Sequence, residues 1–302
     1  MRKVIFVLVL LAPLLGGGLF LYLKNGRLSF KPKKKIFSEL TNNEAFRHFC
    51  RRALASPEIF ATFKQDPIYT LFYENVSQEQ GKELFLYLQR EAPHLLQSEL
   101  LEKFRKEDQV GEPVTCSYPL IGSFSPTTLR AIKVAHDIEK CFGNLNGKKV
   151  VEMGAGHGSL CKILTDLFPE VHYTIIDLPE ALSLAQKTLG MVGVEGVRFL
   201  TSGHLPKEKI DLLISNYTFT ESGAKLQQHY FKKLIQKAEA GYFTCNFFAK
   251  HFRVRPWDKK RLLKNFQSLK VTLEVLPEFP QTGPENLILV WKKGEASRQS
   301  AP

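Results

Sequence analysis

The sequence predicts an α/β fold: a doubly wound, mostly parallel sheet that ends in an antiparallel strand pair, preceded by a helical subdomain and an N-terminal transmembrane helix. Three observations lead to this prediction. From Lys148 onward, short apolar runs rich in β-branched residues alternate with amphipathic helical patterns, which is typical of βαβ units with right-handed crossovers. The last two apolar runs have no helical pattern between them, and a long uncharged stretch stands near the N-terminus.

Val4 to Tyr22 is nineteen residues without a charge, which approaches the roughly 20 that a helix needs to cross a bilayer. A cleaved signal peptide is the alternative, because Gly16 and Gly18 are small enough for a cleavage site. We therefore expect residues 1–35 to form a membrane anchor, or a signal peptide, followed by a basic linker.

The formal net charge is +12, and the first 35 residues carry eight Lys or Arg residues and no acid. The rest of the chain has little basic excess, which argues against a nucleic-acid partner and for a basic segment next to a membrane. Basic residues are more numerous after the uncharged stretch than before it, which predicts a single-pass anchor with the body of the protein on the cytoplasmic side. The five scattered cysteines fit a reducing compartment, and secretion after signal cleavage is the alternative.

Residues 36–117 predict the helical subdomain. Apolar residues recur there at helical spacing in four segments, and start signals precede several of them, such as Ser56 before Pro57 and Ser77 before Glu79. Aromatic residues at the same spacing are interpreted as helical core.

Residues 118–293 predict the sheet domain, and the tail 294–302 is expected to be disordered. A helix that opens at Ser125-Pro126 leads into the sheet. The expected strands are KKVVEMG, VHYTIIDL, GVRFLTS, DLLISNY and GYFTCNFF, followed by KVTLEVLPEF and ENLILVWKK. The expected helices between the strands begin near Ser159, Pro179 and Glu221.

The stretch VVEMGAGHGSL (150–160) contains the end of the first expected strand and the glycine-rich loop that follows it. Gly154, Gly156 and Gly158 have the spacing G-x-G-x-G, whereas the dinucleotide fingerprint is G-x-G-x-x-G. Glycines at a strand-to-helix turn allow backbone amides to approach a ligand closely. Glu152 repels a diphosphate but pairs with the ammonium of an amino acid. The loop therefore predicts a ligand such as S-adenosylmethionine, which has an ammonium, a sulfonium and no phosphate.

The ends of the next strands carry further candidate binding residues. Asp177 ends the second strand, where an acid accepts two hydrogen bonds from a ribose diol, and Leu178 is expected beside the adenine. Ser202 follows the third strand and is expected near the adenine edge. Asn216 and Tyr217 follow the fourth, where cofactor and acceptor should meet. Because the carboxyl ends of parallel strands lie at one edge of a sheet, these residues predict one crevice.

The chain from about 118 to 293 resembles the class I, Rossmann-like S-adenosylmethionine-dependent methyltransferases, and within them the sugar O-methyltransferases. The stretches that carry the resemblance are SPTTLR, FGNLNGKKVVEMGAGHGSLCKIL, YTIIDLPEALSLAQKTL, DLLISNYTFTE and ENLILVW. Two positions depart from the family pattern, since His157 stands where a tyrosine is common and Ser159 where a glycine is common. The resemblance implies S-adenosylmethionine as cofactor and a sugar hydroxyl as acceptor.

A hydroxyl acceptor must lose a proton during methyl transfer, so a general base is expected within hydrogen-bond reach. Glu221, at the start of the helix after Asn216, is the preferred candidate; an interaction with the helix dipole is its alternative role. His157 is the second candidate and is alternatively part of the pocket wall. No Asp, Glu or His residues show metal-ligand spacing, which favours a metal-independent reaction. The basic stretch 250–261 is either a grip for an anionic glycan or lipid head group or a solvated surface.

These observations predict an S-adenosylmethionine-dependent methyltransferase that O-methylates a sugar or glycoconjugate hydroxyl, such as that of a glycolipid, at the cytoplasmic membrane face. A degenerate, non-catalytic scaffold that binds the cofactor and is tethered to the membrane is the alternative. A nicotinamide-dependent oxidoreductase is a third possibility, disfavoured by the glycine spacing.

Overall fold

The computed structural model describes residues 20–24, 27–31, 42–247 and 255–294, and the chain divides into two compact units, Met1–Ala45 and Phe46–Pro302. The expected transmembrane helix lies outside the described residues except for residues 20–22, and these three form strand rather than helix. Over the described part of the chain, no helix combines the length and apolar character that a membrane span requires.

The first unit contains an antiparallel strand pair, β1 (Phe20–Lys24) and β2 (Arg27–Lys31). The sequence between the two strands is Asn-Gly, the dipeptide that most favours a two-residue hairpin connection. This local preference explains why residues 20–22 are in a strand although they end an apolar stretch.

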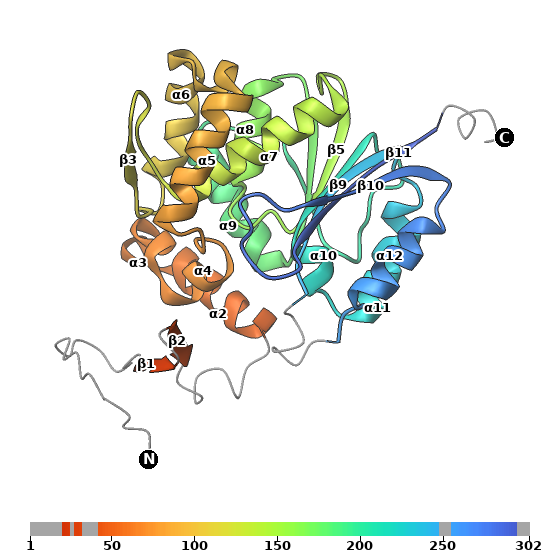
Figure 1. The fold of residues 1–302 in the computed structure, drawn as a ribbon, viewed down its shortest axis with the longest axis horizontal. Coiled ribbons are helices and arrows are strands. Elements are labelled where there is room, and N and C mark those ends of the chain that lie inside the picture. Colours follow the sequence, from red (N-terminus) through yellow and green to blue (C-terminus); the bar gives the residue numbers. More distant parts are fainter. Residues whose placement is uncertain (1–19, 25–26, 32–41, 248–254, 295–302) are drawn as a thin grey trace. The chain divides into compact units, whose positions relative to one another are not determined.

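Short helices fill residues 42–109 (Figure 1). Two of them begin as the sequence predicts: the Ser56 hydroxyl accepts a hydrogen bond from the Ile59 amide at 3.2 Å, and Ser77 forms a capping box with Gln80. The elements are α2 (Asn42–Ala55), α3 (Pro57–Ala61), η1 (Phe63–Gln65), α4 (Pro67–Phe72), α5 (Gln78–Glu91), η2 (Pro93–Leu96), α6 (Ser98–Arg105) and η3 (Lys106–Gln109).

A small hairpin, β3 (Cys116–Tyr118) with β4 (Gly122–Phe124), leads to α7 (Pro126–Phe142). The Ser125 hydroxyl caps α7 by accepting from the Thr128 amide at 3.0 Å. Asp108 of η3 accepts hydrogen bonds from the Ser125 amide and the Thr128 hydroxyl, both at 2.7 Å. The SPTTLR motif therefore fixes the start of α7 against the helical segment.

Within the described residues, the main sheet has seven strands in the order β10-β11-β9-β8-β5-β6-β7. The strands are β5 (Lys149–Met153), β6 (His172–Ile176), β7 (Arg198–Leu200), β8 (Leu212–Asn216), β9 (Ala240–Cys245), β10 (Val271–Pro277) and β11 (Leu287–Lys293). All seven were predicted from the sequence. Strands β5 to β9 pair in parallel, and β11 runs antiparallel to both of its neighbours, β9 and β10. The predicted mostly parallel sheet with an antiparallel end is confirmed, and the last strand is inserted between β9 and β10.

Alternating strand residues cover the two faces of the sheet. Val150 of β5 faces the cluster formed with α5 to α8, whereas Val151 faces the cluster formed with α10 to α12. Figure 1 shows these two groups of helices on opposite sides of the sheet. Leu84 and Phe104 of the helical segment share one hydrophobic cluster with Ile175 of the sheet. Helices α5 and α6 of the helical segment therefore share one core with one face of the sheet.

The remaining helices are α8 (Ser159–Leu167), α9 (Pro179–Met191), α10 (Thr218–Glu221), α11 (Ala224–Tyr230), the π-helical η4 (Phe231–Ile235) and α12 (Lys259–Gln267). Helices α8 and α9 begin where the sequence predicts. The helix expected to start near Glu221 does not: Glu221 is the last residue of α10, because the Ser215 hydroxyl accepts from the Phe219 amide at 3.0 Å and starts the helix early. The expected disordered tail lies outside the described residues apart from Gly294.

Candidate cofactor and active site

The parallel strands β5 and β8 are neighbours in the sheet but not in the sequence, so the chain order reverses between them. Open α/β sheets bind ligands in the crevice at the carboxyl ends of the strands beside such a switch point. The glycine loop leaves β5 at this point, and Gly154, Gly156 and Gly158 have φ angles of 76°, 61° and 95°. These are left-handed values that favour glycine.

Glu152 lies beneath the loop and is only 2 % exposed. Its Oε2 accepts a hydrogen bond from the Tyr173 hydroxyl of β6 at 2.9 Å. Burial is the main cause that raises the pKa of Glu152 to about 7, with the nearby charge of Asp177 adding to it and the Tyr173 hydrogen bond opposing it. A cationic group brought near this carboxyl would favour its ionised form, which fits the predicted pairing with an ammonium.

Asp177 follows β6 and presents a free acceptor. Its Oδ1 accepts from the Leu178 amide at 2.7 Å. Its Oδ2 is buried and has no hydrogen-bond partner. Burial raises the pKa of Asp177 to about 6. A buried acceptor without a donor is costly unless a ligand completes it, and the ribose diol of a nucleoside offers the missing donors.

Tyr73, which follows α4, covers the glycine loop from the helical segment. A Cβ on Gly156 would lie 2.4 Å from the Tyr73 ring, so only glycine fits at that position. Burial raises the pKa of Tyr73 well above its usual value, and the charges of Asp177 and Glu221 raise it further. The guanidinium of Arg130 donates to the Tyr73 carbonyl at 3.0 Å.

His157 is not available as a base. Its Nδ1 is hydrogen-bonded to the Tyr69 hydroxyl and its Nε2 to Glu107 Oε1. Lys64 donates to the same carboxyl oxygen at 2.7 Å, and both Lys64 and Glu107 are almost fully buried. Burial alone would raise the pKa of Glu107, but Lys64 and His157 outweigh it and lower the pKa to about 2. The catalytic prediction for His157 is therefore corrected: its ring ties the glycine loop to α4 through Tyr69 and to η3 through Glu107.

The carboxyl end of β8 supplies the opposite wall of the crevice. Asn216 Oδ1 accepts from the Thr244 hydroxyl at 2.9 Å, which fixes its amide. Tyr217 has a φ of 65°, a strained value for a residue with a side chain, and such strain clusters at functional sites. Its hydroxyl bonds to Glu278, which also accepts from the Thr282 amide at 2.8 Å.

Glu221 is held at the same end of the sheet by a residue that the sequence analysis did not single out. The Asn246 side chain, just after β9, donates to Glu221 Oε1 at 2.7 Å, and the Asn246 amide donates to the Thr220 hydroxyl at 3.2 Å. Burial raises the pKa of Glu221, and the Asn246 hydrogen bond opposes that rise. A carboxylate with a raised pKa at this position is chemically suited to accept a proton.

The third strand contributes less definite contacts. Ser202 is exposed, and its carbonyl accepts from His229 Nε2 at 3.3 Å if that nitrogen carries the proton. Leu178 is half-buried and packs against the aromatic cluster of the helical segment. Both follow the carboxyl ends of their strands, and Ser202 makes no contact with the other candidate residues among the contacts described.

Three binding-site neighbours, Tyr73, Arg130 and Asn246, escaped the sequence analysis. Tyr73 belonged to an aromatic stripe whose spacing predicted core, and nothing in the sequence separates the one ring that covers the loop. Arg130 stands in the SPTTLR motif, and its guanidinium lies 5.9 Å from the centre of the Tyr217 ring. Asn246 stood inside the expected strand GYFTCNFF, and its polar side chain in that apolar run was the only available signal.

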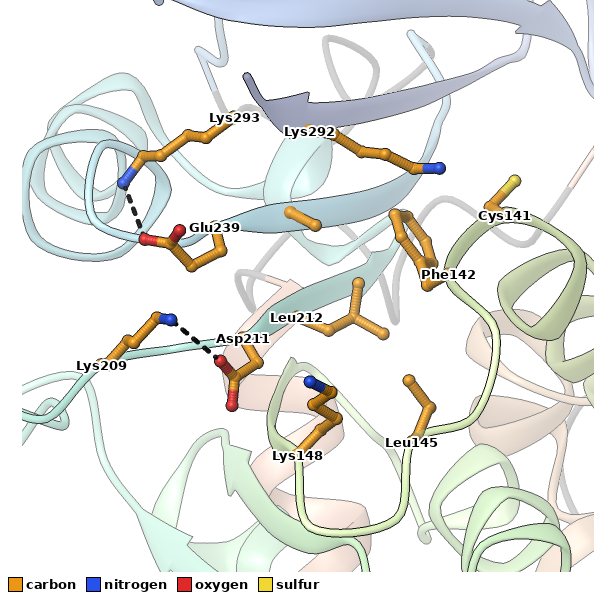
Figure 2. Close-up of a pocket in the computed structure, with 11 residues that line it drawn as sticks. Cys141, Phe142, Leu145, Lys148, Lys209, Asp211, Leu212, Glu239, Lys292 and Lys293 are labelled. Atoms are coloured by element: carbon orange, nitrogen blue, oxygen red, sulfur yellow. Dashed lines mark hydrogen bonds and ion pairs between the residues drawn. The ribbon is translucent and has the colours of Figure 1, made fainter. Parts of the chain in front are cut away.

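A cavity of about 380 Å³ lies at the other edge of the sheet, where the parallel strands begin (Figure 2). Lys148 precedes β5 there, and two ion pairs at 3.5 Å join Lys209 to Asp211 and Lys293 to Glu239. It is distant in topology from the glycine loop and is not the predicted crevice.

No metal site was predicted from the sequence, but the described residues contain one group of possible ligands, His94, His136 and Glu139. His94 lies 42 positions from His136 in the sequence, so no local spacing could reveal the group. The two ligands on α7 are in its C-terminal half, beyond Arg130 of the crevice.

Residues 137–242 match the model of a family described as Methyltransferase small domain. This range contains the glycine loop and Asp177 and ends within β9. The match supports S-adenosylmethionine-dependent methyl transfer, with S-adenosylmethionine as the cofactor. No curated protein matches the chain.

Similar solved structures include several methyltransferases. An S-adenosylmethionine-dependent methyltransferase from Clostridium acetobutylicum is 14% identical over 55% of this chain and 92% of its own, with a TM-score of 0.45. An amino pentose methyltransferase from Micromonospora echinaspora, bound to S-adenosylmethionine, is 12% identical over 54% of this chain and 90% of its own, with a TM-score of 0.44. TM-scores of this size carry no functional conclusion. The assignment of a cofactor depends instead on the strand order, the glycine loop and the family match.

Proposed function

We propose that this protein is an S-adenosylmethionine-dependent methyltransferase that methylates a hydroxyl group of a sugar or glycoconjugate. The observation that carries the proposal is the buried, unpartnered Oδ2 of Asp177 beside three left-handed glycines at the switch point of the sheet. A nucleoside with a free diol completes that acceptor, and the acid Glu152 under the loop disfavours a diphosphate.

Different residues of the chain contact different parts of the cofactor in this proposal. Asp177 accepts the ribose hydroxyls, Leu178 packs beside the adenine and Ser202 lies at its edge. The glycine loop offers its amides, and Glu152 and Asn216 face the amino-acid end. When bound, S-adenosylmethionine supplies a methyl group on a positively charged sulfur.

Glu221 is the proposed general base. Its carboxyl is fixed by Asn246 and its pKa is raised by burial. A carboxylate in this position accepts the proton that the acceptor hydroxyl loses as the new bond to carbon forms. Positioning of the acceptor supplies the other part of the rate.

The sugar acceptor is supported by the resemblance in SPTTLR and DLLISNYTFTE and by the polar groups around Tyr217. Glu278, Thr282 and Asn286 form a hydrogen-bonded cluster with the Tyr217 hydroxyl, with Asn286 donating to Glu278 at 2.8 Å. Hydroxyl and amide groups of this kind suit an acceptor with several hydroxyls. We further propose that the apolar residues before β1, together with the basic residues that follow, keep the protein at the cytoplasmic face of a membrane, where a glycolipid is within reach.

Calorimetric titration of the full chain tests cofactor binding. We expect S-adenosylmethionine to bind and NAD to bind far more weakly. Asp177→Asn removes one charged acceptor and should weaken binding on the order of tenfold or more. Asp211→Asn is the matched control, because Asp211 lines the cavity at the opposite edge of the sheet, and it should leave affinity unchanged. Equal effects of the two substitutions, or tighter binding of NAD, would contradict the proposed site.

The acceptor is tested separately by mass spectrometry of membrane glycans and lipids from cells with and without the gene. The proposal predicts a species that becomes lighter by one methylene when the gene is removed. Cofactor binding without any such change would favour a non-catalytic scaffold instead.

A further inference from the structure

Two histidines and a glutamate come together on the side of α7 that faces η2. His136 and Glu139 are three residues apart on α7 and so share a face of the helix, and His94 is contributed by η2. The possible ligand atoms of the three side chains all lie within 4.8 Å of one another. His94 Nε2 and Glu139 Oε2 are already 2.8 Å apart.

His136 is the unusual member of this group. Its side chain belongs to a residue that is only 6 % exposed, and neither Nδ1 nor Nε2 has a hydrogen-bond partner. Its ring neighbours are the Tyr87 and His94 rings, whose centres lie 6.1 Å and 6.0 Å away. A buried imidazole with both nitrogens unsatisfied carries a desolvation cost that packing alone does not explain.

We propose that His94, His136 and Glu139 bind a divalent transition-metal ion, for which Zn²⁺ is the best match. Two imidazole nitrogens and one carboxylate oxygen are the ligand set that Zn²⁺ accepts, whereas Ca²⁺ and Mg²⁺ prefer oxygen ligands alone. The His94 side chain is 49% exposed and that of Glu139 is 32% exposed, so a fourth position is open to water. An ion here satisfies one nitrogen of His136 and replaces the His94–Glu139 hydrogen bond with two coordinate bonds.

The site has a role apart from the proposed methyl transfer. It connects η2 of the helical segment to α7, which packs on the sheet. The ion would therefore hold these two elements together. Arg130, which contacts Tyr73 and the Tyr217 ring, precedes His136 by six residues, or roughly 9 Å along the helix axis. The ion would therefore stabilise the helix that supports the crevice without touching the cofactor.

The test is a titration of the full-length, metal-free protein with Zn²⁺ by calorimetry and with Co²⁺ by visible absorption. We expect one ion per chain and a Co²⁺ spectrum without a sulfur-to-cobalt charge-transfer band, since the described cysteines are not among the ligands. At free Zn²⁺ a hundredfold above Kd, the midpoint of thermal unfolding should rise by about 5–10 °C.

Three variants make the result specific. His94→Ala and Glu139→Gln alter exposed or half-buried side chains, and each should weaken binding by on the order of tenfold or more while circular dichroism stays unchanged. His172→Ala removes an exposed histidine on β6 and should bind as the parent does. Absence of binding by the parent, equal binding by His94→Ala and Glu139→Gln, or a thiolate band in the Co²⁺ spectrum would each overturn the proposal.

Discussion

Replacing Glu152 by glutamine should stabilise the protein in the absence of cofactor and at the same time weaken cofactor binding. Glu152 is 2 % exposed, and burial raises its pKa from 4.5 to about 7. The folded protein therefore holds this proton over a pH range in which the unfolded chain has lost it. By linkage, the stability that Glu152 contributes is fully present below pH 4.5 and is lost as the pH rises through 7.

The size of the effect follows from the shift. Each pKa unit corresponds to about 1.4 kcal/mol, so ionising Glu152 in the folded state costs about 3 kcal/mol. Glutamine has the same shape, keeps an oxygen for the Tyr173 hydroxyl and carries no charge. Glu152→Gln should therefore raise the free energy of unfolding at about pH 8 by about 3 kcal/mol relative to its effect at acid pH.

Urea unfolding of the apo protein at about pH 5 and about pH 8 measures this difference directly. Glu195→Gln, an exposed glutamate before β7, is the control and should change stability little at either pH. Calorimetry in parallel should show weaker S-adenosylmethionine binding by Glu152→Gln, because the ammonium loses its anionic partner. If Glu152→Gln is destabilising at pH 8, or if its effect does not depend on pH, then ionisation of the buried Glu152 carboxyl does not destabilise the folded protein as we infer.

Three further substitutions test the crevice. Gly156→Ala should lower both stability and cofactor affinity in thermal melts and calorimetry, since its Cβ meets the Tyr73 ring, whereas Gly143→Ala has a left-handed φ of 72° but open space and should affect stability alone. His157→Ala should destabilise by about 3 kcal/mol in urea unfolding, because it leaves part of a buried charged network unpaired; parent-like stability would refute its structural role. Glu221→Gln should lower kcat and remove the acidic limb of the pH–rate profile while S-adenosylmethionine affinity is kept; a lost affinity with normal kcat would show that Glu221 is not the base.

The strands of the sheet could be predicted because each is a short, β-branched apolar run between turn signals, and β5 to β9 bear this out. The position of β11 could not, since the order of strands in a sheet is set by packing between distant residues. The helix after β8 shows the limit of local signals. Glu221 follows a typical strand end. The Ser215 hydroxyl inside β8 nevertheless accepts from the Phe219 amide, so that the helix begins earlier in the chain than expected.

The residues of the candidate site likewise divide into those that local sequence predicts and those that depend on distant contacts. Glu152, Asp177 and the three glycines were predicted because they stand at fixed offsets from the ends of strands. Tyr73 was not, because its role depends on the path of a helical segment whose sequence indicates only core. The histidine of the loop, His157, was interpreted as catalytic because its structural partners could not be seen from the sequence. These partners, Glu107 and Tyr69, lie 50 and 88 positions away.

The chemistry of His157 explains why a histidine can stand where the resembling family commonly has tyrosine. A tyrosine side chain has a single polar atom, its hydroxyl oxygen. An imidazole has two nitrogens on opposite sides of the ring and can bridge two partners. Here those partners are the Tyr69 hydroxyl and Glu107, and Glu107 is also bonded to Lys64. Glu107 carries a full charge into the core only because Lys64 and His157 hold its pKa near 2. A substitution of His157 alone therefore leaves a buried charge short of a partner, so this position should change only together with Glu107 and Lys64. The helical segment therefore supports the proposed cofactor site, because the glycine loop is anchored in it through His157.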